Sequence, residues 1–143
     1  MAYSEEAYNA FVRDMEESFP KMYGKEGDDG YGYGGFAIGV GWWPIIKSLS
    51  ANIQHYLDWK NKTEEVVPQV RVRQVKEKFG GLRFYYDGGD EHVSGMVRMA
   101  EAWADASCEQ CGAPGTRRHG GWIRTLCDTH EAEHQEKQKE RGY

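Results

Sequence analysis

The sequence predicts an α+β fold in which a short antiparallel β-sheet packs with about three helices, followed by a small cysteine-rich module. Three observations carry this prediction. Apolar residues recur at helical spacing in three segments, two other segments alternate as strands around a glycine turn, and all three cysteines lie near the C-terminus. A chain of 143 residues can bury one core of this kind. We therefore divide it into an α+β core domain, residues 1–106, and a C-terminal module, residues 107–143.

The first expected helix runs from Glu5 to Ser18. Ser4 is a good N-cap, and the two glutamates that follow it suit the positive end of a helix. Apolar residues return at every fourth position, which is typical of a helix that packs one face on a core. The members of this stripe are Ala7, Phe11, Met15 and Phe19.

A glycine-rich segment, Gly24 to Gly35, separates this helix from the next. We expect a surface loop, because its sequence matches neither a phosphate-binding nor a calcium-binding loop. Phe36 to Trp43 indicates a short strand or an extended entry to a helix. Pro44 suits the first turn of that helix, which should end at about Trp59.

A β-hairpin is expected next. Valines alternate with arginines in Gln69–Lys76, and apolar residues alternate with Arg83 and Tyr85 in Leu82–Tyr86, so each strand should have one buried and one polar face. Lys78 to Gly81 supplies the turn. The alternation breaks at Gln74–Val75, which indicates a bulge. A third helix should run from about Glu91 to Ala106.

The polar face of this hairpin is a candidate site for an anionic, nucleotide-like ligand. Guanidinium groups bind phosphate bidentately, and an aromatic ring can stack on a base. The two adjacent tryptophans cannot face the same way in an extended chain, so we expect one in the core and the other as a stacking group. A solvent-facing sheet surface without a ligand would show the same pattern. The candidate ligand-binding residues are Arg71, Arg73, Arg83, Tyr85, Trp42 and Trp43.

The last quarter of the chain carries its most specific motif. Cys108 and Cys111 form a Cys-x2-Cys pair, fifteen residues follow, and Cys127 and His130 form a Cys-x2-His pair. Thiolate and imidazole are the ligands that close the tetrahedral shell of structural zinc sites. The sequence therefore predicts a structural Zn2+ ion held by these four residues.

The residues between the two pairs suit a hairpin, with Gly115–Gly121 as the turn region and Trp122–Leu126 as the returning strand. Cys127 and His130 lie three apart, so they share a face if a helix begins there. We expect this last helix to run from Asp128 to about Arg141. A Cys-containing knuckle, a hairpin and a ligand-bearing helix in this order resemble the treble-clef zinc finger.

A second resemblance covers about residues 36–130. The run from Gln74 to Tyr86, together with the two metal-ligand motifs, resembles small uncharacterised proteins of phages and bacteria. The resemblance implies a bacterial host cytoplasm and an accessory or anti-defence role. In that role, a non-enzymatic binding protein would bind or sequester a nucleotide-like ligand.

Two alternative functions remain open. One is a protein-interaction module that inhibits a host protein through the glycine-rich loop or the polar last helix. The other is a metal-dependent nuclease or phosphodiesterase in which His119 activates water. That chemistry needs a second set of metal ligands, and none is evident beside His119.

Composition limits the partners further. The net charge of −5 argues against indiscriminate binding to duplex DNA, which depends on many phosphate contacts. No apolar run approaches the ~20 residues of a membrane span. All three cysteines are assigned to the metal, which leaves none for a disulfide and fits a reducing cytoplasm.

Overall fold

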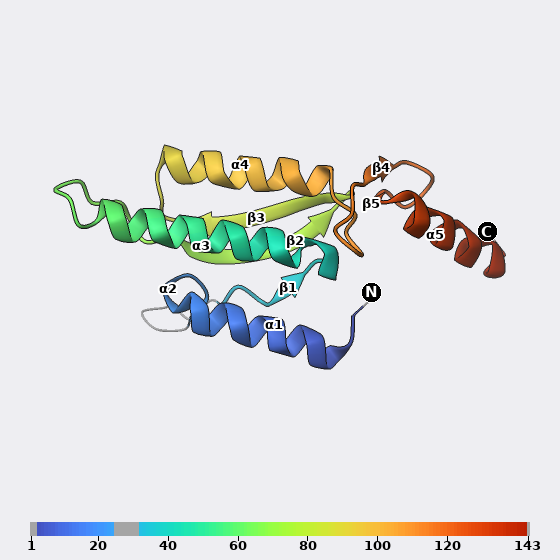
Figure 1. The fold of residues 1–143 in the computed structure, drawn as a ribbon, viewed down its shortest axis with the longest axis horizontal. Coiled ribbons are helices and arrows are strands. Elements are labelled where there is room, and N and C mark those ends of the chain that lie inside the picture. The colour runs from blue at the N-terminus through green and yellow to red at the C-terminus, as the bar shows by residue number, and fades with distance from the viewer. Residues whose placement is uncertain (1–2, 25–31, 143) are drawn as a thin grey trace.

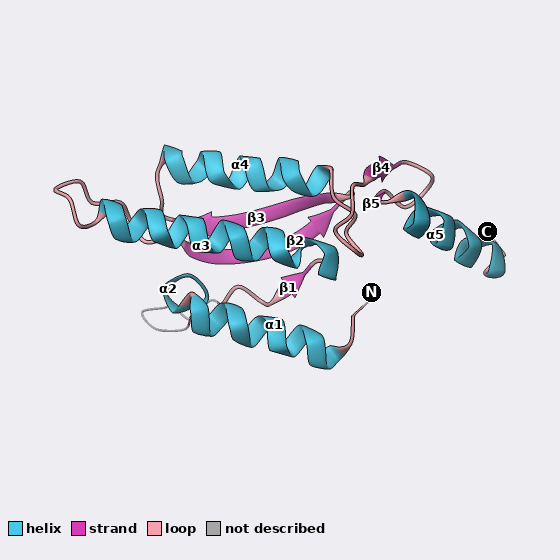
Figure 2. Ribbon diagram, viewed as in Figure 1, coloured by secondary structure: helices cyan, strands magenta, loops and turns pink. Residues whose placement is uncertain are grey.

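The computed structural model describes residues 3–24 and 32–142 (Figure 1). Within this part of the chain, five α-helices, a three-stranded mixed sheet and a two-stranded hairpin confirm the predicted α+β class (Figure 2). In chain order the elements are α1 (Glu5–Ser18), α2 (Pro20–Tyr23), β1 (Phe36–Ala37), the 3-10 helix η1 (Val40–Trp42), α3 (Trp43–Lys60), β2 (Arg71–Lys78), β3 (Gly81–Asp87), α4 (Glu91–Asp105), β4 (Thr116–Arg118), β5 (Arg124–Leu126) and α5 (Asp128–Glu140).

The main sheet has the strand order β1-β2-β3. β2 and β3 form the predicted antiparallel hairpin, but β1 adds to β2 in parallel, with Phe36 opposite Val75. The sheet is therefore mixed. Two residues of β1 are too few to show an alternating pattern, and their partner strand lies far along the chain.

The turn and the bulge of the hairpin follow from local backbone geometry. Phe79 and Gly80 both have positive φ, of 51° and 79°, as a two-residue type I′ turn requires. Glu77 Oε2 accepts a hydrogen bond of 2.7 Å from the Gly80 N–H. The register shifts between Val72 and Gln74, so Arg73 is the extra residue of the bulge. The bulge thus lies one residue before the predicted position.

Helices cover one face of this sheet. α4 packs against both α3 and β3 (Figure 1), and the buried side chains of α3, α4, β2 and β3 form one hydrophobic cluster. α1 joins the cluster beside β1, where the rings of Phe11 and Phe36 lie 4.9 Å apart. Lys76, Arg83 and Tyr85 alternate with the buried residues of β2 and β3 and lie on the opposite surface of the hairpin. We call this second surface the open face.

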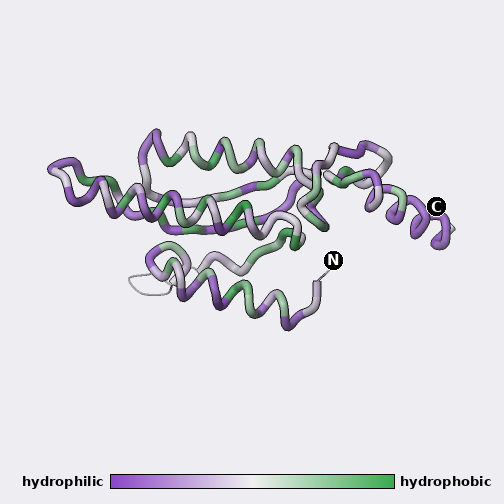
Figure 3. Tube along the Cα trace, in the orientation of Figure 1, coloured by the Kyte–Doolittle hydropathy of each residue, from purple (hydrophilic) through white to green (hydrophobic). Residues whose placement is uncertain are grey.

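The helices begin and end close to the predicted residues. Ser4 caps α1, since its Oγ accepts a hydrogen bond of 3.1 Å from the Ala7 N–H, and Asp90 caps α4 in the same way. α5 differs from the others, because none of its residues is buried. Figure 3 shows this helix as almost uniformly hydrophilic. In the described residues, every helix is too short or too polar to cross a bilayer.

Candidate metal centre

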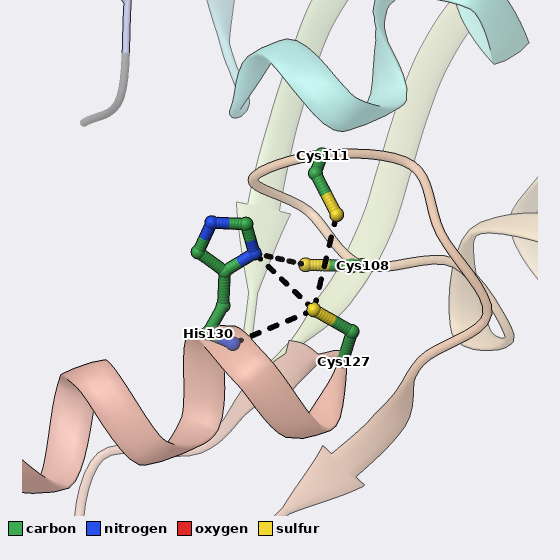
Figure 4. A group of neighbouring side chains, drawn as sticks. All are labelled: Cys108, Cys111, Cys127 and His130. Atoms are coloured by element: carbon green, nitrogen blue, oxygen red, sulfur yellow. Dashed lines mark hydrogen bonds between the residues drawn. The ribbon is translucent and has the colours of Figure 1, made fainter.

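Four side chains from two segments converge at the start of α5 (Figure 4). Cys108 and Cys111 come from the knuckle, which we define as Cys108–Gly112. Cys127 lies directly before α5, and His130 lies in its first turn. Their four ligand atoms all lie within 4.8 Å of one another. The structure thereby brings together all four predicted metal ligands.

The distances within this group fit a tetrahedral zinc ion. With Zn–S bonds of about 2.3 Å and Zn–N bonds of about 2.0 Å, tetrahedral corners lie about 3.8 Å apart for two sulfurs and about 3.5 Å apart for sulfur and nitrogen. Cys111 Sγ lies 3.8 Å from Cys127 Sγ, and Cys108 Sγ lies 3.6 Å from His130 Nδ1. The Cys127 Sγ–His130 Nδ1 distance is shorter, at 3.2 Å. The donor set and spacing suit a structural ion, because four protein ligands complete the shell.

The electrostatics of the group also favour a cation. Burial raises the pKa of the Cys108 thiol, but backbone N–H groups directed at its sulfur outweigh burial, so this pKa is lowered overall. At Cys111, the Ala113 N–H lowers the thiol pKa, whereas burial and the sulfurs of Cys108 and Cys127 raise it, with a net upward shift. Neighbouring thiolates therefore repel one another, and a divalent ion removes that repulsion.

The surroundings orient the histidine and the helix that carries it. His130 Nδ1 faces the sulfurs, and its Nε2 lies 3.9 Å from Glu133 Oε2. Metal-binding histidines commonly donate their other ring N–H to a carboxylate, and Glu133 is the nearby carboxylate here, although 3.9 Å is longer than a hydrogen bond. Arg118 of β4 donates to the Leu126 carbonyl at 3.0 Å and to Asp128 at 2.8 Å, which fixes the hairpin to the start of α5.

The knuckle packs directly on the core domain. The Gly41 N–H donates to the Glu109 carbonyl at 2.7 Å, and the Trp42 indole N–H donates to the Ser107 carbonyl at 2.9 Å. A side chain at Gly41 would collide with the Cys108 carbonyl oxygen, so only glycine permits this approach. The metal-binding segment is thus joined to η1 by short contacts between backbones.

A polar cavity of about 470 Å³ lies beside the metal centre, and the sequence did not indicate it. Its most buried polar side chain is that of Glu109, which is 5% exposed and lies between the two knuckle cysteines. Burial raises the pKa of this carboxyl, while the Gly39 N–H and Arg124 act in the opposite direction. We call this cavity the polar pocket. The one sequence signal for this pocket was Glu109, an acidic residue between two predicted metal ligands.

The candidate ligand-binding residues do not form one cluster. Arg71, Arg73, Arg83 and Tyr85 lie on β2 and β3, as expected. Arg71 donates to the carbonyls of Lys21 and Gly24, at 3.2 and 3.1 Å, and Arg73 Nε lies 2.6 Å from Asp87 Oδ2. These two arginines are therefore engaged by the protein itself.

The two tryptophans lie on the helix-covered side. Trp42 is 0% exposed and is the core member of the pair. Trp43 begins α3, and its ring stacks on that of Phe11, with centroids 4.7 Å apart. Neither ring belongs to the open face, because both pack among residues of the core cluster.

Two further candidate regions are placed only in part. His119 is exposed in the connection between β4 and β5 and is not a member of the metal-ligand group found among the described residues. Of the glycine-rich loop Gly24–Gly35, residues 25–31 lie outside the described part of the chain.

Comparisons of the whole chain with family models, curated proteins and solved structures find no match.

Proposed function

We propose that this chain is a zinc-stabilised, non-enzymatic binding protein that holds a nucleotide-like anionic ligand on the open face of its sheet. The supporting observation is that, in the described part of the chain, α3 and α4 pack on one face of the β2–β3 hairpin. The other face presents Lys76, Arg83 and Tyr85 as neighbours. A flat surface with two cations and an aromatic ring offers the contacts that a phosphate and a base need.

The charges on the open face favour an anion. Lys76 lies directly opposite Arg83 in the strand register, and like charges in this position repel each other. Neither side chain forms an ion pair with a carboxylate of the described residues. Lys76 Nζ lies 5.9 Å from the centroid of the Tyr85 ring, which is 44% exposed. A phosphate between the two cations would relieve the repulsion and leave the ring free to stack.

The metal centre supports a role in stability rather than catalysis. Its four protein ligands leave no open position for water or substrate. In this proposal the protein has an accessory role, and the bound ligand is a nucleotide signal of a bacterial host.

Calorimetry with nucleoside mono-, di- and triphosphates and with cyclic nucleotides tests this proposal. We expect Arg83→Ala to weaken binding of the ligand at least tenfold, since one charge-assisted contact to phosphate contributes about 1.5–3 kcal/mol. Arg13→Ala is the matched control, because Arg13 is exposed on α1, away from the open face. An unchanged affinity in Arg83→Ala would show that the open face is not the ligand site.

An apolar groove supports the alternative of a protein-interaction module. It lies between α3 and α4, has a volume of about 500 Å³ and is lined in part by Met96, Met99 and Trp103. Met99 is 70% exposed, and exposed methionines are common on adaptable interaction surfaces. A partner retained by the unaltered protein should be lost with Met99→Glu. Equal retention by both proteins would argue against this groove.

A further inference from the structure

The polar pocket has the size and the walls of a small-molecule site. Its volume of about 470 Å³ lies within the range of roughly 300–1,000 Å³ that is usual for ligand pockets. Most of its lining comes from the knuckle, from Trp122 just before β5 and Arg124 at its start, and from helix α5. Glu77 of β2 also lines it. Glu77 follows Lys76 of the open face, and successive residues of a strand point to opposite faces. The pocket is therefore separate from the open face.

The inner end of the pocket is acidic. Glu109 is 5% exposed, and its Oε2 accepts a hydrogen bond of 2.9 Å from the Gly39 N–H. Its Oε1 receives no hydrogen bond from the described residues. Glu77 lies near it and accepts from Gly80 at 2.7 Å. Oε1 is not among the buried polar atoms that lack a partner, so it is accessible from the pocket, where a ligand that donates N–H groups can bind it in place of water.

The outer end of the pocket is basic and aromatic. Trp122 is 65% exposed, and the Arg124 guanidinium lies 5.7 Å from the centroid of its ring. Lys137 and Arg141 are exposed and follow each other at i,i+4 on one face of the last helix and its C-terminal end. None of these three cations forms an ion pair with a described carboxylate.

We infer that the polar pocket binds a guanine nucleotide. The guanine edge carries two adjacent N–H donors, N1–H and the 2-amino group, which match the two oxygens of one carboxylate, that of Glu109. Each carboxylate oxygen can accept more than one hydrogen bond, so the contact with Gly39 is kept. The base would stack on Trp122, and its phosphate would lie against Lys137 and Arg141. Adenine offers a single donor beside an acceptor at the same edge and fits this carboxylate poorly.

This site depends on the metal but not on the proposed function of the open face. Glu109 belongs to the knuckle, Trp122 to the segment before β5, and Lys137 to α5. The Cys108, Cys111, Cys127 and His130 group holds these parts together. Removing the metal should therefore abolish the pocket.

The test is calorimetry of the zinc-loaded protein with GMP, IMP and AMP at low salt. GMP should bind, and IMP, which lacks the 2-amino group, should bind at least tenfold more weakly. A polar site rejects a ligand that leaves its buried acceptor unpaired, and AMP should therefore bind more weakly still. Absence of GMP binding, or equal affinity for GMP and AMP, would overturn the inference.

Variants locate the nucleotide within the molecule. Glu109→Gln keeps an oxygen for the Gly39 N–H but should remove the preference for GMP over IMP. If this variant loses its zinc, Lys137→Ala is the second test, because Lys137 is exposed and its side chain forms no hydrogen bond or ion pair with the described residues. Lys137→Ala should weaken GMP binding about threefold to tenfold.

The control for Lys137→Ala is Lys139→Ala, which removes an equal charge from the same helix but does not line the pocket. GMP binding that is weakened in Arg83→Ala and unchanged in Lys137→Ala would assign the nucleotide to the open face and overturn the pocket. GMP binding that is weakened in Lys137→Ala and unchanged in Arg83→Ala would support the pocket and argue against the open face as the nucleotide site.

Discussion

The core domain and the metal-binding segment are stabilised by different forces. In the core domain, side chains from α1, α3, α4 and the sheet form one cluster that includes fully buried residues such as Trp42 and Ile53. Beyond Ser107, the fully buried residues are few, and α5 buries none. Hydrophobic burial is too small to offset the chain entropy of such a unit, so we expect coordination of a metal by the Cys3His group to supply the difference. Removing the metal and removing core volume should therefore affect different parts of the molecule.

The largest expected effect follows the loss of a metal ligand. Cys127→Ala leaves three ligands, and structural zinc contributes about 10–16 kcal/mol of apparent binding free energy in small zinc-dependent folds. We expect residues 107–142 to lose protection in hydrogen exchange while the core domain keeps it. His134→Ala is the control, since His134 lies on α5, the helix that Cys127 caps, but outside the ligand group. Loss of protection throughout the chain would show that the core domain also depends on the metal.

The next largest effect should follow a truncation in the hydrophobic core, which should lower the stability of the fold without changing the zinc content. Ile53 is 0% exposed on α3, and its truncation in Ile53→Ala should lower the free energy of unfolding by about 2–5 kcal/mol. Zinc content, measured by elemental analysis of the folded protein, should stay unchanged. His55→Ala, an exposed change on the same helix, serves as the control. A loss of zinc in Ile53→Ala at temperatures where the protein remains folded would show that the metal centre depends on packing in the core domain.

A smaller effect should appear at the joint between the two regions. In Gly41→Ala the new methyl group meets the Cys108 carbonyl oxygen and backbone nitrogens of the knuckle, and crowding of this kind costs about 1–3 kcal/mol. Unlike Ile53→Ala, this change should weaken both the fold and the retention of zinc against a chelator. Gly95→Ala is a sharp control, because nothing lies within 4 Å of its new methyl group and alanine favours the helix. Equal zinc retention in both variants would mean that crowding at the contact between Gly41 and the knuckle does not weaken metal binding.

The parts that the sequence predicted are those whose signals are local. The N-cap of Ser4, the stripe along α1 and the two metal-ligand pairs each depend on residues a few positions apart. The metal ligands were found because their spacing reports the knuckle and the helix turn directly.

The parts that were missed depend on contacts between distant segments. β1 pairs with a strand almost forty positions away, and Glu109 of the polar pocket meets Gly39 across seventy residues. The choice between Trp42 and Trp43 as the core residue was decided by the carbonyl of Ser107. Arg71 and Arg73 showed a regular polar alternation in the sequence, but their carbonyl and carboxylate partners come from α2, the segment after it and β3. No pattern along one strand contains that information.

The smallest expected effect is a dependence on pH that is confined to the core domain. Tyr56 donates a hydrogen bond of 2.6 Å to Asp90 Oδ2, and Asp90 also caps α4. These bonds lower the pKa of Asp90, and the bond to Asp90 raises the pKa of Tyr56 to about 12. A lowered carboxyl pKa stabilises the fold above the unfolded value, and that contribution is lost as the pH falls below about 4. A raised tyrosine pKa stabilises the fold below pH ~10, and that contribution is lost as the pH approaches 12.

Tyr56→Phe removes this pair while it keeps the ring. We expect a lower unfolding midpoint than that of the unaltered protein between about pH 5 and 9, and a difference that narrows toward both extremes. The shift should be smaller than that of Ile53→Ala, because the pair lies near the surface, where water screens its interaction. Zinc content should not change, since Asp90 and Tyr56 lie outside the metal-ligand group. A constant difference from pH 3 to pH 11 would mean that the hydroxyl acts by packing, and that the Tyr56–Asp90 hydrogen bond does not contribute.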